Sequence, residues 1–178
     1  MSERILVAYS TVDGHTQTIS ARIAAVLSEA GHDVTQASFD ELPMPSPADF
    51  DRVVVGGSIR YGKHRENVVT WINRHATALG SMPGAFFSVN LVARKPDRDR
   101  VETNPYVERF LKRIDWRPDA VAIFAGKLNY PAYSFWDRQV IRLIMWMTNG
   151  PTNPDAVVDY TDWARVEVFA RDLVSLRK

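Results

Sequence analysis

The sequence predicts a doubly wound α/β fold, in which one parallel five-stranded sheet carries helices on both faces. Short, β-branched apolar segments alternate along the chain with longer segments that repeat apolar residues at helical spacing. The 178 residues fit a single domain, and a hydrophobic content of 46% suffices for a sizeable core. Five strands in such a sheet favour the order 2-1-3-4-5.

The strands are predicted from apolar runs that Gly, Pro, Asp or Ser bound on either side. They lie at residues 5–9, 34–39, 53–55, 85–89 and 121–125. Helices are predicted at residues 15–30, 65–79 and 162–176, and in the segment TNPYVERFLKRI. Gly31 is suited to follow the end of the first helix. Asn104 and Pro105 are typical of the start of the third helix in chain order.

One segment departs from this alternation. Between the fifth strand and the last helix lie about 35 residues, 126–160, which is long for a connection in a compact domain. Ser134 and Asp137 resemble a capping box and predict a helix over about residues 135–147. At ~1.5 Å per residue this helix is too short to span a ~30 Å hydrocarbon layer.

Three interpretations of this helix remain open. Arg138 and Arg142 are four residues apart and share one helical face among many apolar residues. This pattern suits a helix lying at a membrane surface with its basic face toward lipid headgroups, or a wall that packs apolar rings. The alternative is an ordinary amphipathic core helix.

Composition excludes several functional classes. The chain has no cysteine, so disulfides, thiolate nucleophiles and cysteine-held metals are ruled out, and no metal site is predicted. A net charge of +1 gives no overall basic field for nucleic acid. Basic residues outnumber acidic ones between Arg94 and Arg142, which suits an anionic ligand there or, equally, an ordinary solvated surface. No signal peptide or membrane-spanning run is recognised, so a cytoplasmic location is expected.

The loop after the first strand carries the strongest functional signal. It comprises Ser10, Thr11, Val12, Asp13, Gly14, His15 and Thr16. Hydroxyl groups and the amides of a helix N-terminus bind phosphate oxygens, and glycine allows a close backbone approach. The loop lacks the Gly-Lys-Ser/Thr of nucleoside triphosphate sites and the Gly-x-Gly-x-x-Gly of dinucleotide sites. It therefore favours a single phosphate monoester such as that of FMN. The alternative is that its hydroxyls only cap the helix.

Two further loops should meet this one, because ligands bind at the carboxyl ends of parallel strands. They comprise Ser58, Ile59, Arg60, Tyr61 and Gly62, and then Ser88, Val89, Asn90 and Leu91. We expect Tyr61 to lie against a flavin ring, and Ser88 and Asn90 to reach its pyrimidine edge. His15, His64 and His75 are the candidates for a general base at neutral pH. His64 is nearest the expected flavin edge, and we expect it to be a solvated loop histidine. The alternative is that both loops are ordinary surface turns.

The sequence resembles the flavodoxin-like, quinone-dependent protoporphyrinogen IX dehydrogenases of bacterial haem biosynthesis. The resemblance extends over nearly the whole chain. It rests on STVDGHT, DRVVVGGSIRYGKH, HATALGSMPGAFFSVNLVARKP, WRPDAVAIFAGKLNYPAY, DRQVIRLIMWM and YTDW. It implies a flavodoxin-like fold, FMN as cofactor, protoporphyrinogen IX as electron donor and menaquinone or ubiquinone as acceptor. It also implies a peripheral location on the cytoplasmic face of the membrane.

The resemblance leaves the catalytic side chains unassigned, because the N5 atom of FMN carries the chemistry in this family. Candidates for binding the propionates of the substrate are Arg60, Lys63, Arg94, Lys95, Arg138 and Arg142. Three alternatives stay open at this point. They are a flavodoxin-type electron carrier, an FMN-dependent NAD(P)H:quinone reductase, and a non-enzymatic membrane-surface module whose loop binds only phosphate.

Overall fold

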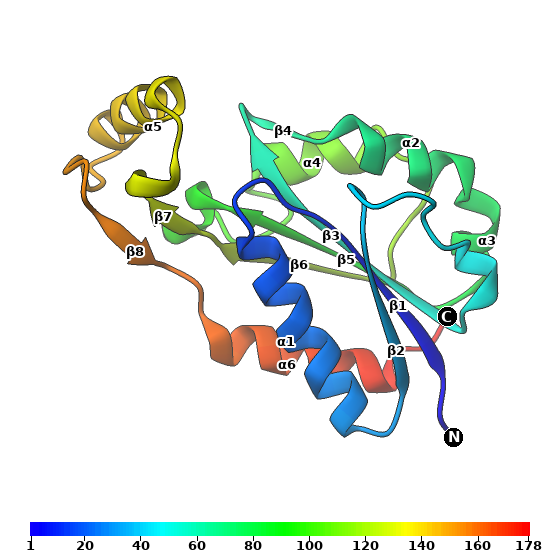
Figure 1. Ribbon diagram of the computed structural model, residues 1–178. Coiled ribbons are helices and arrows are strands. Elements are labelled where there is room, and N and C mark those ends of the chain that lie inside the picture. Colours follow the sequence, from blue (N-terminus) through cyan, green and yellow to red (C-terminus); the bar gives the residue numbers. More distant parts are fainter.

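The computed structural model describes all 178 residues and confirms the doubly wound fold (Figure 1). Its central sheet consists of parallel strands β1 (Arg4–Ser10), β2 (Asp33–Ser38), β3 (Arg52–Arg60), β5 (Gly84–Asn90) and β6 (Ala120–Ala125). Their spatial order is β2-β1-β3-β5-β6, which is the predicted order 2-1-3-4-5. The apolar runs of the sequence reflect this position, because helices cover both faces of the inner strands.

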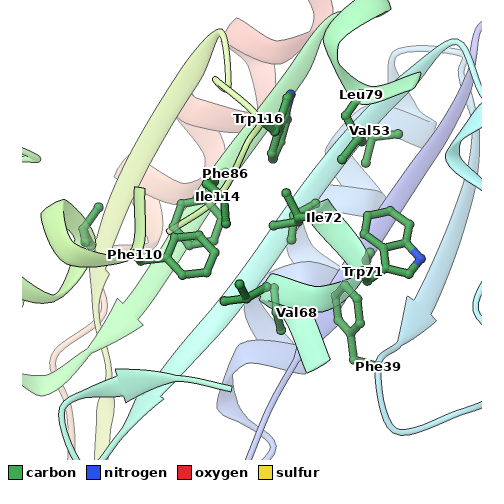
Figure 2. Close-up of a cluster of buried hydrophobic side chains, with 14 of the residues drawn as sticks. Phe39, Val53, Val68, Trp71, Ile72, Leu79, Phe86, Phe110, Ile114 and Trp116 are labelled. Carbon is green, nitrogen blue, oxygen red and sulfur yellow. The ribbon is translucent and has the colours of Figure 1, made fainter. Parts of the chain in front are cut away.

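Two layers of helices enclose the sheet. Helices α1 (His15–Glu29) and α6 (Trp163–Ser175) pack against the face that carries Ile5, Val54 and Phe87. Helices α2 (Glu66–Arg74), α3 (Ala76–Ser81) and α4 (Pro105–Leu111) pack against the other face, where Figure 2 shows the buried cluster around Ile72, Phe110 and Trp116. Alternate residues of each strand therefore belong to different halves of the core.

The predicted helix at residues 65–79 is wrong in one respect. The structure divides it into α2 and α3 at His75, whose φ of −108° and ψ of 15° lie outside helical values. The division lets α3 turn so that Leu79 can enter the core cluster. The start of α4 is confirmed, because the Asn104 side chain accepts hydrogen bonds from the amides of Tyr106 and Val107.

Strand β3 continues beyond its predicted end and folds back. Its partner β4 (Lys63–His64) pairs with it in antiparallel fashion, with Arg60 opposite Lys63. The two-residue turn between them has positive φ at both Tyr61 (50°) and Gly62 (74°), as a type I′ hairpin turn requires. The expected loop at residues 58–62 is thus the tip of a hairpin that projects past the sheet.

The segment 126–160 forms a small subassembly beside the carboxyl edge of the sheet (Figure 1). Strands β7 (Lys127–Asn129) and β8 (Val157–Asp159) pair in antiparallel fashion, and helix α5 (Phe135–Met147) has the predicted bounds. Leu128, Tyr130, Tyr133 and Met145 form a core of their own. The remaining short 3-10 turns are η1 (Pro47–Asp49), η2 (Leu91–Arg94) and η3 (Tyr130–Ala132). None of the helices combines the length and the apolar composition needed to cross a bilayer.

Candidate flavin site

The three loops singled out in the sequence begin side by side. In the sheet register Ser10 lies opposite Gly57, and Gly57 lies opposite Ser88, so the chain leaves β1, β3 and β5 at one edge. Gly56 is required here because a Cβ atom on it would come within 2.1 Å of the Phe87 ring. The predicted convergence of the loops is therefore confirmed.

The first loop has the features of a phosphate site. Gly14 adopts a φ of +82°, and its amide donates a 2.9 Å hydrogen bond to Oγ1 of Thr11. Helix α1 begins at the next residue and no side chain caps it, so its first amides are available to an anion. The Ser10 hydroxyl is buried and has no hydrogen-bond partner in the protein. This unpaired hydroxyl and the uncapped helix end fit the phosphate of FMN.

The histidine of this loop has a different role from the hydroxyls. His15 Nε2 lies 2.6 Å from Oγ1 of Thr161, which itself donates a hydrogen bond to the carbonyl of Ala125. Its Nε2 also lies 3.6 Å from a carboxylate oxygen of Asp159. Burial lowers the pKa of His15 and outweighs the opposite effect of Asp159. The His15 side chain thus fastens the phosphate loop to the segment that leaves the insert.

The hairpin tip joins three distant segments through one group, which we call the Asp137 cluster: Asp13, Arg60, Tyr61, Ser134 and Asp137. One nitrogen of the Arg60 guanidinium lies 3.1 Å from Asp13 Oδ1, and the other donates to Asp137. The Tyr61 hydroxyl donates to the same carboxylate, and so does the Ser134 hydroxyl at 2.7 Å. The sequence pattern indicates Asp137 only as a capping residue, because nothing in its spacing places α5 beside β3.

Within this cluster, the pKa values of Asp137 and Tyr61 are shifted in opposite directions. Hydrogen bonds from Tyr61 and Ser134 lower the pKa of Asp137, while the Asp137 carboxylate raises the pKa of the Tyr61 phenol. The carboxylate is therefore charged and the phenol neutral throughout the physiological range. Close by in the chain, the buried Ser58 hydroxyl has no partner in the protein, which suits a bond to a flavin ring atom.

The side chains of the third loop are used inside the protein, contrary to expectation. Ser88 Oγ is fully buried at 2.9 Å from His64 Nε2, and Asn90 Oδ1 accepts from the amide of Ala93. Asn104 Nδ2 lies 3.3 Å from Asn90 Oδ1. Ser88 and Asn90 thus shape the loop, and in this arrangement they do not reach outward toward a pyrimidine ring. The partly exposed Leu91 packs against the core of the insert, and Val89 belongs to the sheet core.

The expectation for His64 is also wrong. Its imidazole is buried between Phe86 and Phe110, with ring centroids 5.5 Å and 4.4 Å away. This apolar environment lowers its pKa to about 3, so the ring is neutral at physiological pH. His64 anchors the return strand of the hairpin and does not face solvent.

Most of the six candidate propionate-binding cations already have partners. Arg60 pairs with Asp13 and Asp137, and Arg94 donates to the backbone carbonyl and hydroxyl of Thr148. The other two arginines donate to backbone carbonyls inside the insert, Arg138 to Tyr130 and Arg142 to Thr152. The remaining two candidates are Lys63 and Lys95, whose ammonium groups stay free for an anionic ligand.

The basic face of α5 therefore does not face outward as predicted. Arg138 and Arg142 turn toward the body of the insert, where backbone carbonyls accept their hydrogen bonds. The outward face is apolar, and its exposed large side chains are Phe135, Trp136, Val140, Leu143, Ile144, Trp146 and Met147.

Fold and site together define a protein of the flavodoxin type. The family model named Flavodoxin domain matches residues 6–155, and the chain belongs to this family. Among solved structures, the short-chain flavodoxin associated with a non-canonical PDU bacterial microcompartment superimposes with a TM-score of 0.57 at 14% identity, covering 98% of both chains. Oxidised flavodoxin 1 from Bacillus cereus gives a TM-score of 0.54 at 13% identity, covering 97% of both. The family assignment and the loop geometry make FMN the cofactor.

Curated proteins of similar sequence indicate a narrower functional class than the fold does. The chain is 44% identical over 173 residues to protoporphyrinogen IX dehydrogenase [quinone] of Escherichia coli strain K12, covering 97% of this chain and 96% of the relative. It is 42% identical over 180 residues to the protein of the same name from Leishmania major, covering 98% of this chain and 76% of the relative.

Proposed function

We propose that this protein is an FMN-dependent, quinone-linked dehydrogenase that oxidises protoporphyrinogen IX to protoporphyrin IX in haem biosynthesis, with menaquinone or ubiquinone as acceptor. The observation that carries the proposal is 44% identity across almost the full length of both chains, the insert included. Bound FMN would supply the two-electron redox chemistry. Three two-electron oxidations remove six electrons and six protons from the macrocycle and convert three quinones to quinols.

The residues of the chain would hold the cofactor and define the edge at which substrates approach. The N-terminus of α1 and the Ser10 hydroxyl would bind the phosphate, and the Ser58 hydroxyl would bond the ring. The chain offers no exposed histidine near Tyr61 to act as a base, because His64 is buried. Protons leaving the macrocycle would therefore pass to water. The side chains contribute position and electrostatics to the reaction.

The outward face of α5 supports docking at the bilayer surface. Full burial of each large apolar side chain is worth about 1.5–3 kcal/mol, so partial insertion of several of them favours reversible binding. The absence of a basic outward face means that this binding would depend on apolar insertion more than on anionic headgroups. The protein would then meet its quinone at the cytoplasmic membrane surface, in keeping with the peripheral location that its sequence resemblance implies.

Vesicle flotation tests the docking. We expect the protein to float with zwitterionic phosphatidylcholine vesicles, and Leu143→Asp to abolish flotation. Val168→Asp is the matched control, because Val168 is an exposed apolar residue on α6, in the flavodoxin part of the chain. Flotation that requires anionic lipid, or that Leu143→Asp leaves intact, would contradict docking through the apolar face of α5.

Anaerobic stopped-flow spectroscopy tests the enzymatic function. Mixing the FMN-loaded protein with protoporphyrinogen IX should bleach the flavin, and a menaquinone analogue should restore its colour. Bleaching by NAD(P)H alone would favour a NAD(P)H:quinone reductase. No bleaching by either donor would favour a flavodoxin-type electron carrier. A protein that binds phosphate but not FMN would point to a non-enzymatic module.

A further inference from the structure

Helix α5 is hydrogen-bonded to the β3–β4 hairpin through a single carboxylate. All hydrogen bonds between α5 and the β3–β4 hairpin end on Asp137, one from Arg60 and one from Tyr61. Arg60 continues the connection to Asp13 in the phosphate loop. The opposite end of α5 is held differently, by Met145 in the core of the insert and by Arg94 at Thr148.

The position of this carboxylate has a consequence for the exposed aromatic side chains. Tyr61 is 72% exposed and sits in a left-handed turn, so its ring is fixed by the hydrogen bond to Asp137 and by the Arg60 guanidinium, which lies 5.7 Å from the ring centroid. Phe135 and Trp136 occupy the same helical turn as Asp137, are 64% and 76% exposed, and contact each other edge to face. Asp137 thus brings Tyr61 and two further aromatic rings to the edge where the flavin loops end.

Exposed aromatic rings at a redox site suit a flat, largely apolar substrate such as a porphyrinogen macrocycle. We propose that Asp137 is a positioning residue that acts through Tyr61: it holds the phenol and the first turn of α5 together as a contact surface for the macrocycle. Asp137 does not touch the reacting atoms. The inference rests on the proposed function, since it names the surface that function would use.

The test variant is Asp137→Asn, which removes the charge but leaves the backbone cap at Ser134, since the Asp137 amide is the donor there. Asp155→Asn is the matched control. It makes the same charge change within the insert, at an exposed side chain that has no partner. We expect Asp137→Asn to raise the KM for protoporphyrinogen about tenfold, as loss of a charge-assisted contact predicts. The FMN dissociation constant and the reoxidation rate with water-soluble menadione should stay within about twofold.

A double-mutant cycle with Tyr61→Phe distinguishes positioning from a general structural effect. If Asp137 acts through Tyr61, the double variant should be no worse than Asp137→Asn alone. Additive losses in KM would overturn the proposal, as would a KM for Asp137→Asn equal to that of the wild type or of Asp155→Asn.

Amide hydrogen exchange of the apoprotein provides a readout that is independent of turnover. Amides in the first turns of α5 should exchange about five- to tenfold faster in Asp137→Asn than in Asp155→Asn, and amides of α6 should not change. Equal protection of α5 in both variants would refute the connection. Wild-type protein that never oxidises protoporphyrinogen would instead refute the proposed function, and the exchange result would still stand.

Discussion

Gly14 is the residue at which the phosphate loop is most sensitive to a small change. Its φ of +82° lies in the left-handed region, and a Cβ atom placed on it would meet no other atom within 4 Å. Gly14→Ala therefore adds backbone strain without a steric clash. For an L-residue this conformation costs about 1–2 kcal/mol.

The strain must appear in one of two measurements. If the loop relaxes in the apoprotein, FMN binding restores the strained conformation and the dissociation constant rises about five- to thirtyfold. If the loop keeps its conformation without FMN, the apoprotein loses the same free energy and Tm falls by about 2–8 °C. Fluorescence titration of FMN and thermal unfolding of the apoprotein together measure the total free energy of the strain.

Gly80→Ala is the matched control for this experiment. Gly80 lies in α3, also has open space where a Cβ atom would be added, and has no positive φ. This substitution should leave the FMN dissociation constant unchanged and should stabilise the helix slightly. If Gly14→Ala matched the wild type in both dissociation constant and Tm, the left-handed loop would be refuted.

Buried or paired polar groups give three further predictions. His64 has a pKa of about 3 in the folded protein, against an ordinary value of 6.5. Below pH 6.5 the unfolded chain therefore binds a proton at His64 that the folded protein does not bind, and the free energy of unfolding falls as the pH drops. Urea unfolding should show a loss of about 2 kcal/mol from this residue between pH 7 and pH 5, and His64→Gln should abolish that share; an unchanged pH dependence would refute it. Asn104→Ala removes the buried cap of α4 and should lower the free energy of unfolding by about 1–3 kcal/mol, whereas an unaltered denaturation midpoint would mean that the cap is dispensable. Arg94→Gln releases Thr148 at the end of α5 and should speed proteolysis within the insert while FMN affinity stays constant; equal proteolysis rates would show that other contacts hold that end.

The sheet and its ligand edge could be predicted because their signals are local. Strands covered on both faces must be apolar along their length, and this produces the runs that predict β1, β3 and β5. The strand order then places the loops at one edge without any knowledge of side-chain contacts. The helix break at His75 and the hairpin after β3 could not be predicted in the same way. Tyr61 occupies a turn position where Asn or Gly is the usual residue, so the turn carries no sequence signature.

The direction of the side chains within the predicted loops was harder to predict from the sequence. Ser88 and Asn90 are polar residues at a ligand edge, and the local sequence offers no reason to turn them inward. Their direction depends on His64 and Asn104, which come from β4 and from the start of α4. A buried histidine and a buried asparagine need partners, and the loop side chains supply them. Contacts between residues far apart in the chain therefore decide which polar groups remain for the cofactor.

The orientation of α5 is another feature that the local sequence does not determine. Its sequence places two arginines on one face and aliphatic and aromatic residues on the others, which is the pattern of a helix with its charges in water. In the insert, the carbonyls of Tyr130 and Thr152 accept hydrogen bonds from the two guanidinium groups, and the Tyr130 carbonyl also accepts one from the Tyr133 amide in the turn η3. These bonds satisfy donors that would otherwise be left unpaired when the two side chains are enclosed. Arg138 and Arg142 therefore turn inward, and the apolar residues remain outside. An outward apolar face is costly in water, and this cost is the physical reason for our proposal that the face docks at a bilayer surface.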